Sequence, residues 1–253
     1  VKFAKKNQSP IFVYQSITKL RWLGRILVIL STISLTLQVV VYLSLMIQVY
    51  IAAAHALQDE AKLLDLDTSR LFLNIPDVLN ANMMFWELVM YPMVADAFRN
   101  NSTFNPDLMA PGFTKFSEIF EPYQEYVSEQ AKAVDYLRAL TLTNSEFMTY
   151  LTWCHSQNTT NRLQLADILV KPMQRLTKYN LIIRRIITYT ESEESKALLD
   201  HMNIQIEHKY NIEEMSFILF SKNSAQNQSG DRCIPIRSTD CQRNARLVMY
   251  LVA

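Results

Sequence analysis

The residues that most often carry chemistry are scattered along this chain rather than gathered into a motif. The four histidines share no metal-ligand spacing, and the three cysteines lie far apart without a CxxC pair. A zinc site or a disulfide framework is therefore not expected, and a reducing compartment fits. Neither GxxxxGK[ST] nor GxGxxG occurs, so neither route to nucleotide binding is available. We expect no cofactor, no metal and no covalent catalysis.

One stretch, 168–190, does combine residue types that could bind a partner. On a helical wheel its apolar side is Leu169, Met173, Leu176, Ile183 and Ile187. The other side, which we call the basic stripe, consists of Lys171, Gln174, Arg175, Lys178, Ile182, Arg185 and Tyr189. A solvated charged face is the ordinary alternative. The stripe has no acid for i,i+4 pairing, however, and it includes two apolar side chains, which is typical of an interface with an acidic protein.

The elements that must position this stripe are predicted to be helices. Only three of the 253 residues are glycine, which disfavours tight β-turns. Apolar residues recur at helical spacing through 67–94, with Asp67-Thr68 as a predicted N-cap, and Asn144 is a second cap candidate. The loops between them are short. We predict an all-α, elongated antiparallel helical bundle, with residues 163–190 as one continuous central helix.

The N-terminal part of the chain leaves two alternatives open. Residues 1–25 carry six basic side chains and no acid, and 26–58 contain no Asp, Glu, Lys or Arg. Such a run is long enough to cross a membrane. It equally suits a long bundle helix with a neutral polar outer face. A net charge of +1, without a basic patch on the patterned part of the chain, gives no sign of nucleic-acid binding.

Three segments together resemble a known family. The segment LADILVKPMQRLTKYN (165–180) resembles the third conserved region of Dbl-homology domains, the exchange factors for Rho-family GTPases, and departs from its pattern clearly at Asn180, where Pro is usual. LFLNIPDVL (71–79) and GFTKFSEIFEPYQEYV (112–127) resemble two further regions. The likeness extends over about residues 40 to 215, and the sequence of these segments is most similar to the pleckstrin-homology-domain-containing family G.

The resemblance implies a function and a set of contact residues. Such domains bind the switch regions of a Rho GTPase and stabilise its nucleotide-free form, so that GTP replaces GDP. Lys178 and Asn211 fall on positions that contact the GTPase, and Ile182 and Arg185 are predicted to join them. Lys171, Gln174 and Arg175 are predicted to support the face.

Two departures from the family pattern qualify the function. The first conserved region normally carries a Thr-Glu pair, whereas here the first acid of any kind is Asp59, although Tyr42 matches a nearby Tyr. The alternative is therefore an exchange-impaired helical scaffold that docks a GTPase or sits at a membrane. We divide the chain into an uncertain basic and apolar segment (1–37), a Dbl-homology-like domain (38–220) and a mostly disordered tail (221–253) without a pleckstrin-homology domain.

The resemblance also bears on location. If Gln38 to Ala54 form the first bundle helix, their apolar surface is needed for packing, which disfavours a transmembrane span. We expect a cytoplasmic protein, with peripheral membrane association as a further option.

Overall fold

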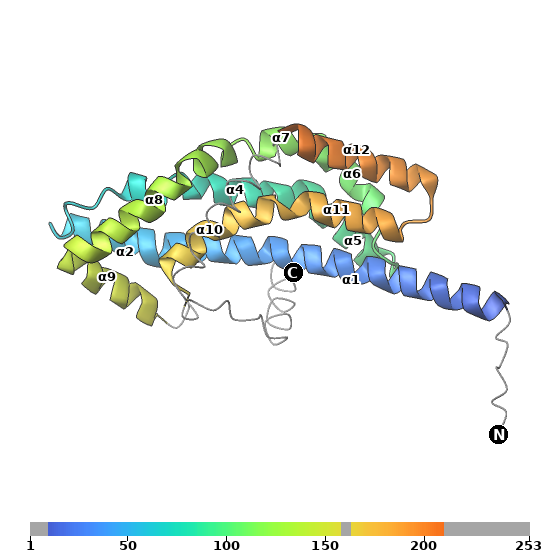
Figure 1. The fold of residues 1–253 in the computed structure, drawn as a ribbon, viewed down its shortest axis with the longest axis horizontal. Coiled ribbons are helices and arrows are strands. Elements are labelled where there is room, and N and C mark those ends of the chain that lie inside the picture. Colours follow the sequence, from blue (N-terminus) through green and yellow to red (C-terminus); the bar gives the residue numbers. More distant parts are fainter. Residues whose placement is uncertain (1–9, 158–162, 210–253) are drawn as a thin grey trace, which may run out of the picture.

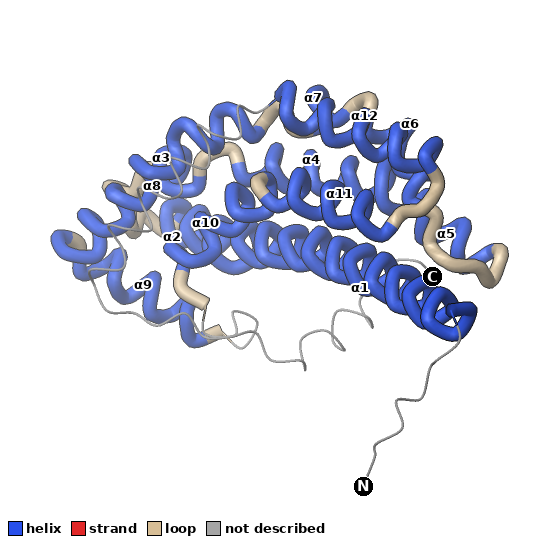
Figure 2. The backbone as a smooth tube through the Cα atoms, turned by 45° about the vertical axis from the view of Figure 1, so that its right-hand side comes forward, coloured by secondary structure: helices blue, strands red, loops and turns tan. Residues whose placement is uncertain are grey.

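The structure, a computed structural model, describes residues 10–157 and 163–209, and within them the chain is helical with no strand (Figures 1 and 2). The long helices that build the body are α1 (Pro10–Leu45), α2 (Ala52–Asp59), α4 (Ile75–Phe85), α5 (Tyr91–Arg99), α8 (Tyr123–Thr143), α9 (Ser145–Ser156), α10 (Leu165–Leu176), α11 (Lys178–Tyr189) and α12 (Glu193–Lys209). Shorter pieces join them: η1 (Met46–Ile51), α3 (Thr68–Phe72), η2 (Trp86–Met90), η3 (Pro106–Met109), α6 (Ala110–Phe113) and α7 (Phe116–Ile119). The predicted elongated, antiparallel helical bundle is confirmed.

Helix α1 is the axis of the bundle. It continues through the π-helical turn η1 into α2, since the joining residues keep right-handed helical torsions. Along its length α1 packs against α4, α10 and α11, while α12 packs on α11 and the short helices α6 and α7 (Figure 2). The N-terminal end of α1 extends beyond the other helices (Figure 1).

The apolar surface of α1 is used inside the bundle. Ile29, Ile33 and Leu37 are buried, and Met46 and Tyr50 are completely so. The helix from Lys19 to Asp59 is long and apolar enough to cross a membrane. Its most apolar 18-residue window has a mean hydropathy of 2.3, but 39% of that window is buried by the protein. No break in the helix coincides with the boundary expected at residue 38, and that boundary stays a prediction.

An aromatic cluster fills the core between α4, α7 and α11. Phe85 lies 4.7 Å from Tyr179 and Phe116 lies 4.6 Å from Phe120, measured between ring centroids. All four rings are at most 2% exposed. Offset and edge contacts of this kind stabilise a core beyond the area they bury. Tyr179 belongs to the segment with the basic stripe, so the cluster fixes α11 from behind.

Both predicted N-caps are present. Asp67 accepts a hydrogen bond from the backbone N–H of Arg70 at 3.0 Å, and Asn144 accepts one from Phe147 at 2.9 Å. Each cap satisfies a backbone donor that the first helical turn leaves free.

The prediction of one continuous helix over 163–190 is wrong. The helix is interrupted at Thr177, between α10 and α11, although Thr177 keeps a right-handed helical conformation (φ −67°, ψ −17°). Its hydroxyl donates to the Gln174 carbonyl at 3.1 Å, a local bond that competes with the helical ladder. Pro172, one turn earlier, also lacks the N–H that the ladder needs. Helices α10 and α11 both pack against α1, one after the other along its length (Figure 1).

Candidate functional site

The structure divides the basic stripe between the interior and the surface. Lys178 and Arg185 are exposed, whereas Lys171, Gln174, Ile182 and Tyr189 are half-buried. Arg175 is only 2% exposed. The helical wheel placed Arg175 on the same open face as Lys178, and that placement is wrong. The reason is that α1 lies against this flank of α10 and covers it.

Arg175 joins α10 to α1. One of its nitrogens, Nη2, donates to the Thr32 carbonyl at 3.2 Å and to the Thr36 hydroxyl, and its guanidinium lies 4.2 Å from the centre of the Tyr179 ring. The Thr36 hydroxyl in turn donates to the Thr32 carbonyl at 2.9 Å. Nε and Nη1 of Arg175 have no hydrogen-bond partner among the described residues. Arg175 is thus a buried cation held by neutral groups and a ring face, and its predicted supporting role remains a prediction.

The other three cations of the stripe have no described acid beside them. Within the described ranges, no ion pair involves Lys171, Lys178 or Arg185. The ammonium of Lys171 lies 5.8 Å from the centre of the Tyr42 ring, and the guanidinium of Arg185 lies 5.1 Å from that of Tyr189. The pKa of Lys178 is lowered, first by partial desolvation and then by the nearby cations Arg175 and Lys171. A carboxylate from a partner would relieve this repulsion.

A groove runs between α1 and α11 beside these cations. It has a volume of about 330 Å³ and is lined by Leu27, Val28, Ser31 and Leu35 of α1 and by Lys178, Leu181, Ile182 and Arg185 of α11. Leu181 is 66% exposed and Leu27 is 59% exposed. The groove therefore has an apolar floor with a cation toward each end. Apolar anchors beside unpaired charges are typical of protein interfaces.

Three of the eight residues that line this groove, namely Lys178, Ile182 and Arg185, are among the predicted GTPase-contact residues, and that role stays a prediction. Leu181 and the α1 side of the groove were not predicted. Leu181 stands three residues after Lys178 and four before Arg185, so helical spacing was a sufficient signal for it. No local signal indicated which residues of α1 would lie opposite.

A polar cluster with residues from both helices joins α12 to α11. The Glu207 carboxylate accepts hydrogen bonds from Asn180 at 2.6 Å, from Arg184 at 2.8 Å and from Asn203 at 2.8 Å. These bonds, that from Arg184 above all, lower the pKa of Glu207. Asn180, the departure from the family pattern, is thus a buried contact to α12. Asn211, a predicted GTPase contact, lies outside the described residues.

The part of α1 that faces the stripe carries no carboxylate. The first acid along the chain is Asp59, and the side chain of Gln38 donates to the Tyr42 hydroxyl at 2.9 Å. Among the described residues, no group of three or more His, Cys, Asp or Glu is placed to hold a metal.

Comparison with known proteins decides the family. The sequence model of the RhoGEF domain matches residues 39–210. The chain belongs to the RhoGEF family. Human pleckstrin homology domain-containing family G member 5 is 33% identical over 154 residues, covering 61% of this chain and 15% of that protein. Mouse family G member 6 is 29% identical over 160 residues, covering 63% and 20%. The chain therefore spans at most a fifth of the length of these relatives.

Solved structures agree with this fold. The Vav1 structure with an allosteric inhibitor has a TM-score of 0.65 at 20% identity, and the match covers 75% of this RhoGEF chain and 32% of that one. The DH/PH domains of PDZ-RhoGEF in complex with activated RhoA have a TM-score of 0.61 at 21% identity, covering 77% and 54%. At these identities the likeness shows the Dbl-homology fold alone.

Proposed function

We propose that this chain is a guanine-nucleotide exchange factor for a Rho-family small GTPase. Membership of the RhoGEF family supports the activity. The observation that supports this docking face is the α1–α11 groove. Lys178 and Arg185 line it without an ion pair to any described residue, and Leu181 and Ile182 lie between them. The DH/PH domains of PDZ-RhoGEF, whose fold this chain shares, were solved in complex with RhoA. That complex supports a GTPase of the same family as the partner here.

The proposed mechanism needs no covalent bond in the exchange factor. Exchange is accelerated only if the chain binds the nucleotide-free GTPase more tightly than the loaded one. Lys178 donates to acidic or carbonyl groups of a switch region, and the apolar floor holds a switch side chain. Arg175 and the Glu207 cluster act from behind the face, because they fix α1 and α12 against α10 and α11. The chain is thus a GTPase regulator rather than an enzyme.

The cytoplasm is the compartment this function requires. Rho-family GTPases exchange nucleotide there, and a free, buried cysteine, Cys154, is compatible with a reducing environment.

The release rate of a fluorescent GDP analogue from Rho-, Rac- and Cdc-type GTPases tests the proposal. Addition of the folded chain should accelerate release from at least one of them. Spontaneous rates throughout, with helical circular dichroism intact, would contradict exchange activity.

A second candidate is a scaffold that docks a GTPase without accelerating exchange. It is favoured by one observation, namely the lack of any carboxylate on α1 in the described residues. Binding of a GTPase in pull-down experiments, together with spontaneous release rates, would select this candidate.

A further inference from the structure

The N-terminal end of α1 carries an exposed row of leucines that the bundle does not use. Leu20, Leu23, Leu27 and Leu30 are 68%, 47%, 59% and 45% exposed. We call them the leucine stripe. Their spacing of three, four and three residues places them on one side of the helix. The buried Ile29 and Ile33 lie on the other side, and the helix end projects past the bundle (Figure 1).

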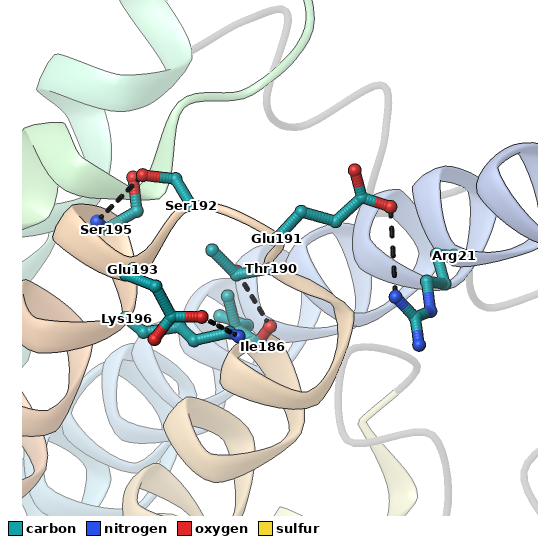
Figure 3. Close-up of polar contacts among 8 residues, drawn as sticks. All are labelled: Arg21, Ile186, Thr190, Glu191, Ser192, Glu193, Ser195 and Lys196. Carbon is teal, nitrogen blue, oxygen red and sulfur yellow. Dashed lines mark hydrogen bonds and ion pairs between the residues drawn. The ribbon is translucent and has the colours of Figure 1, made fainter.

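The surroundings of the leucine stripe are basic. Lys19, Arg21 and Arg25 belong to the same section of helix, and no acid occurs in the first 58 residues. One described carboxylate approaches from outside the helix: Glu191, in the loop before α12, lies 3.9 Å from Arg21, with both side chains more than half exposed (Figure 3). Such an exposed pair holds its members weakly. The Lys19–Leu30 section therefore carries three cations and no acid of its own.

Trp22 adds a third feature. It is 47% exposed, directly before Leu23. Tryptophan favours the boundary between lipid headgroups and acyl chains, where its ring is in an apolar layer and its N–H can find a polar partner.

Three occupants could cover a surface of this kind. A second copy of the chain would bring Lys19, Arg21 and Arg25 close to the same charges, which repel. A transmembrane course is opposed by the packing of the same helix, because Ile29, Ile33 and Leu37 are already in the bundle core. An anionic lipid surface fits both properties at once, since leucines enter the headgroup boundary while the basic side chains reach acidic headgroups.

We propose that the Lys19–Leu30 section of α1 binds peripherally to anionic membranes, with the leucine stripe inserted at the headgroup boundary. The proposal does not depend on the exchange activity. One member of the stripe, Leu27, also lines the groove that contains Lys178, whereas Leu20 and Leu23 do not. They can therefore be changed without touching the proposed GTPase face.

Cosedimentation of the full chain with vesicles tests the proposal. The chain should bind vesicles of phosphatidylcholine with phosphatidylserine, bind pure phosphatidylcholine much more weakly, and lose binding as salt screens the charges. The double variant Leu20→Glu/Leu23→Glu should bind at least about tenfold more weakly, because losing even one interfacial leucine costs more than the free energy of a tenfold change.

The matched control is Leu142→Glu, which changes an 86% exposed leucine on α8, at the far end of the bundle, and should leave vesicle binding unchanged. In a Trp86→Phe/Trp153→Phe background, Trp22 emission should shift to the blue on anionic vesicles only. This variant's fold is checked by circular dichroism.

Four results would overturn the proposal. They are equal binding to neutral and anionic vesicles, undiminished binding by the double variant, resistance of the bound chain to carbonate extraction, and a concentration-dependent dimer that the double variant abolishes without any vesicle binding. Loss of vesicle-free exchange in the double variant, with vesicle binding retained, would assign Leu20 and Leu23 to the GTPase face instead. Failure of exchange itself, in contrast, would leave the lipid result unaffected.

Discussion

Lys178 is the residue on which the proposed docking face depends most. It is exposed, has no acid beside it among the described residues, and stands at the edge of the apolar groove. Truncating a central charge of an interface typically costs about 2–5 kcal/mol in binding. Lys178→Ala should therefore weaken GTPase binding strongly and reduce its salt dependence, as measured by calorimetry at two ionic strengths.

The control for that variant is Lys132→Ala, which removes an exposed lysine on α8, paired with Glu129. Both substitutions should change the free energy of unfolding by less than about 0.5 kcal/mol, as surface changes usually do. Equal affinity of Lys178→Ala and the parent for every GTPase that binds would mean that the basic stripe is a solvated surface.

At Arg175, packing and hydrogen bonds stabilise the fold while desolvation of the guanidinium destabilises it. It fills space between α1 and α10 and donates to Thr32 and Thr36, yet two of its nitrogens have no partner among the described residues. Arg175→Ala should lower the free energy of unfolding by roughly 2–5 kcal/mol, because a large buried side chain is removed. Arg175→Met should be within about 1 kcal/mol of the parent, because an apolar side chain of similar length avoids the desolvation cost.

Urea unfolding of the two Arg175 variants measures whether packing or the desolvation cost of the guanidinium dominates. A methionine variant as unstable as the alanine variant would show that the hydrogen bonds to α1 outweigh the desolvation of the guanidinium.

At the scale of elements, Gly112 sets how closely α6 approaches η2. A Cβ at this position would lie 2.4 Å from the Leu88 carbonyl oxygen and 2.6 Å from Val89 Cγ2. Backbone cannot move away as a flexible side chain can, so Gly112→Ala should destabilise the fold by about 1–3 kcal/mol. Gly24→Ala is the comparison, because its Cβ would meet the half-buried Tyr189 ring at 2.7 Å. Thermal unfolding should show the larger loss for Gly112→Ala, and the reverse order would contradict this packing.

The contact between α11 and α12 should depend on pH through Glu207. Hydrogen bonds in the folded state lower its pKa, so the stability it contributes is complete above the pKa of an unfolded glutamate. That contribution is lost as the pH falls through the lower folded-state value. It is modest, since the Glu207 side chain is 42% exposed.

Urea unfolding at neutral and acidic pH measures this effect. Glu207→Gln should be less stable than the parent at neutral pH, and the difference should shrink on acidification. A difference that stays constant with pH would show that the Glu207 charge does not hold α12.

At the scale of the whole molecule, much of the fold could be predicted from the sequence. Scarce glycine and helical spacing indicated a helical bundle, and Asp67 and Asn144 marked helix starts that the structure confirms. These signals are local, since each depends on a few residues of one segment. The interruption at Thr177 was missed because a side-chain bond to the Gln174 carbonyl leaves no mark in the apolar periodicity.

The site was predicted less completely, for a physical reason. A helical wheel gives the angle of a side chain around its own helix, but it does not say which neighbouring helix covers that angle. Arg175 and Lys178 therefore looked equivalent, whereas α1 buries the first and leaves the second open. Leu27 and Leu35 also line the groove, although they lie far from Lys178 in the sequence.

The central claim is that the chain prefers the nucleotide-free state of a Rho-family GTPase. The most direct measurement compares the affinity of the chain for one GTPase in two states, loaded with GDP and magnesium, and stripped of both by EDTA and phosphatase. An exchange factor must bind the stripped state far more tightly, because only this difference accelerates release. We predict at least about a hundredfold preference, or roughly 2.7 kcal/mol. Equal affinity for the two states would contradict exchange activity and leave the chain a GTPase-binding scaffold.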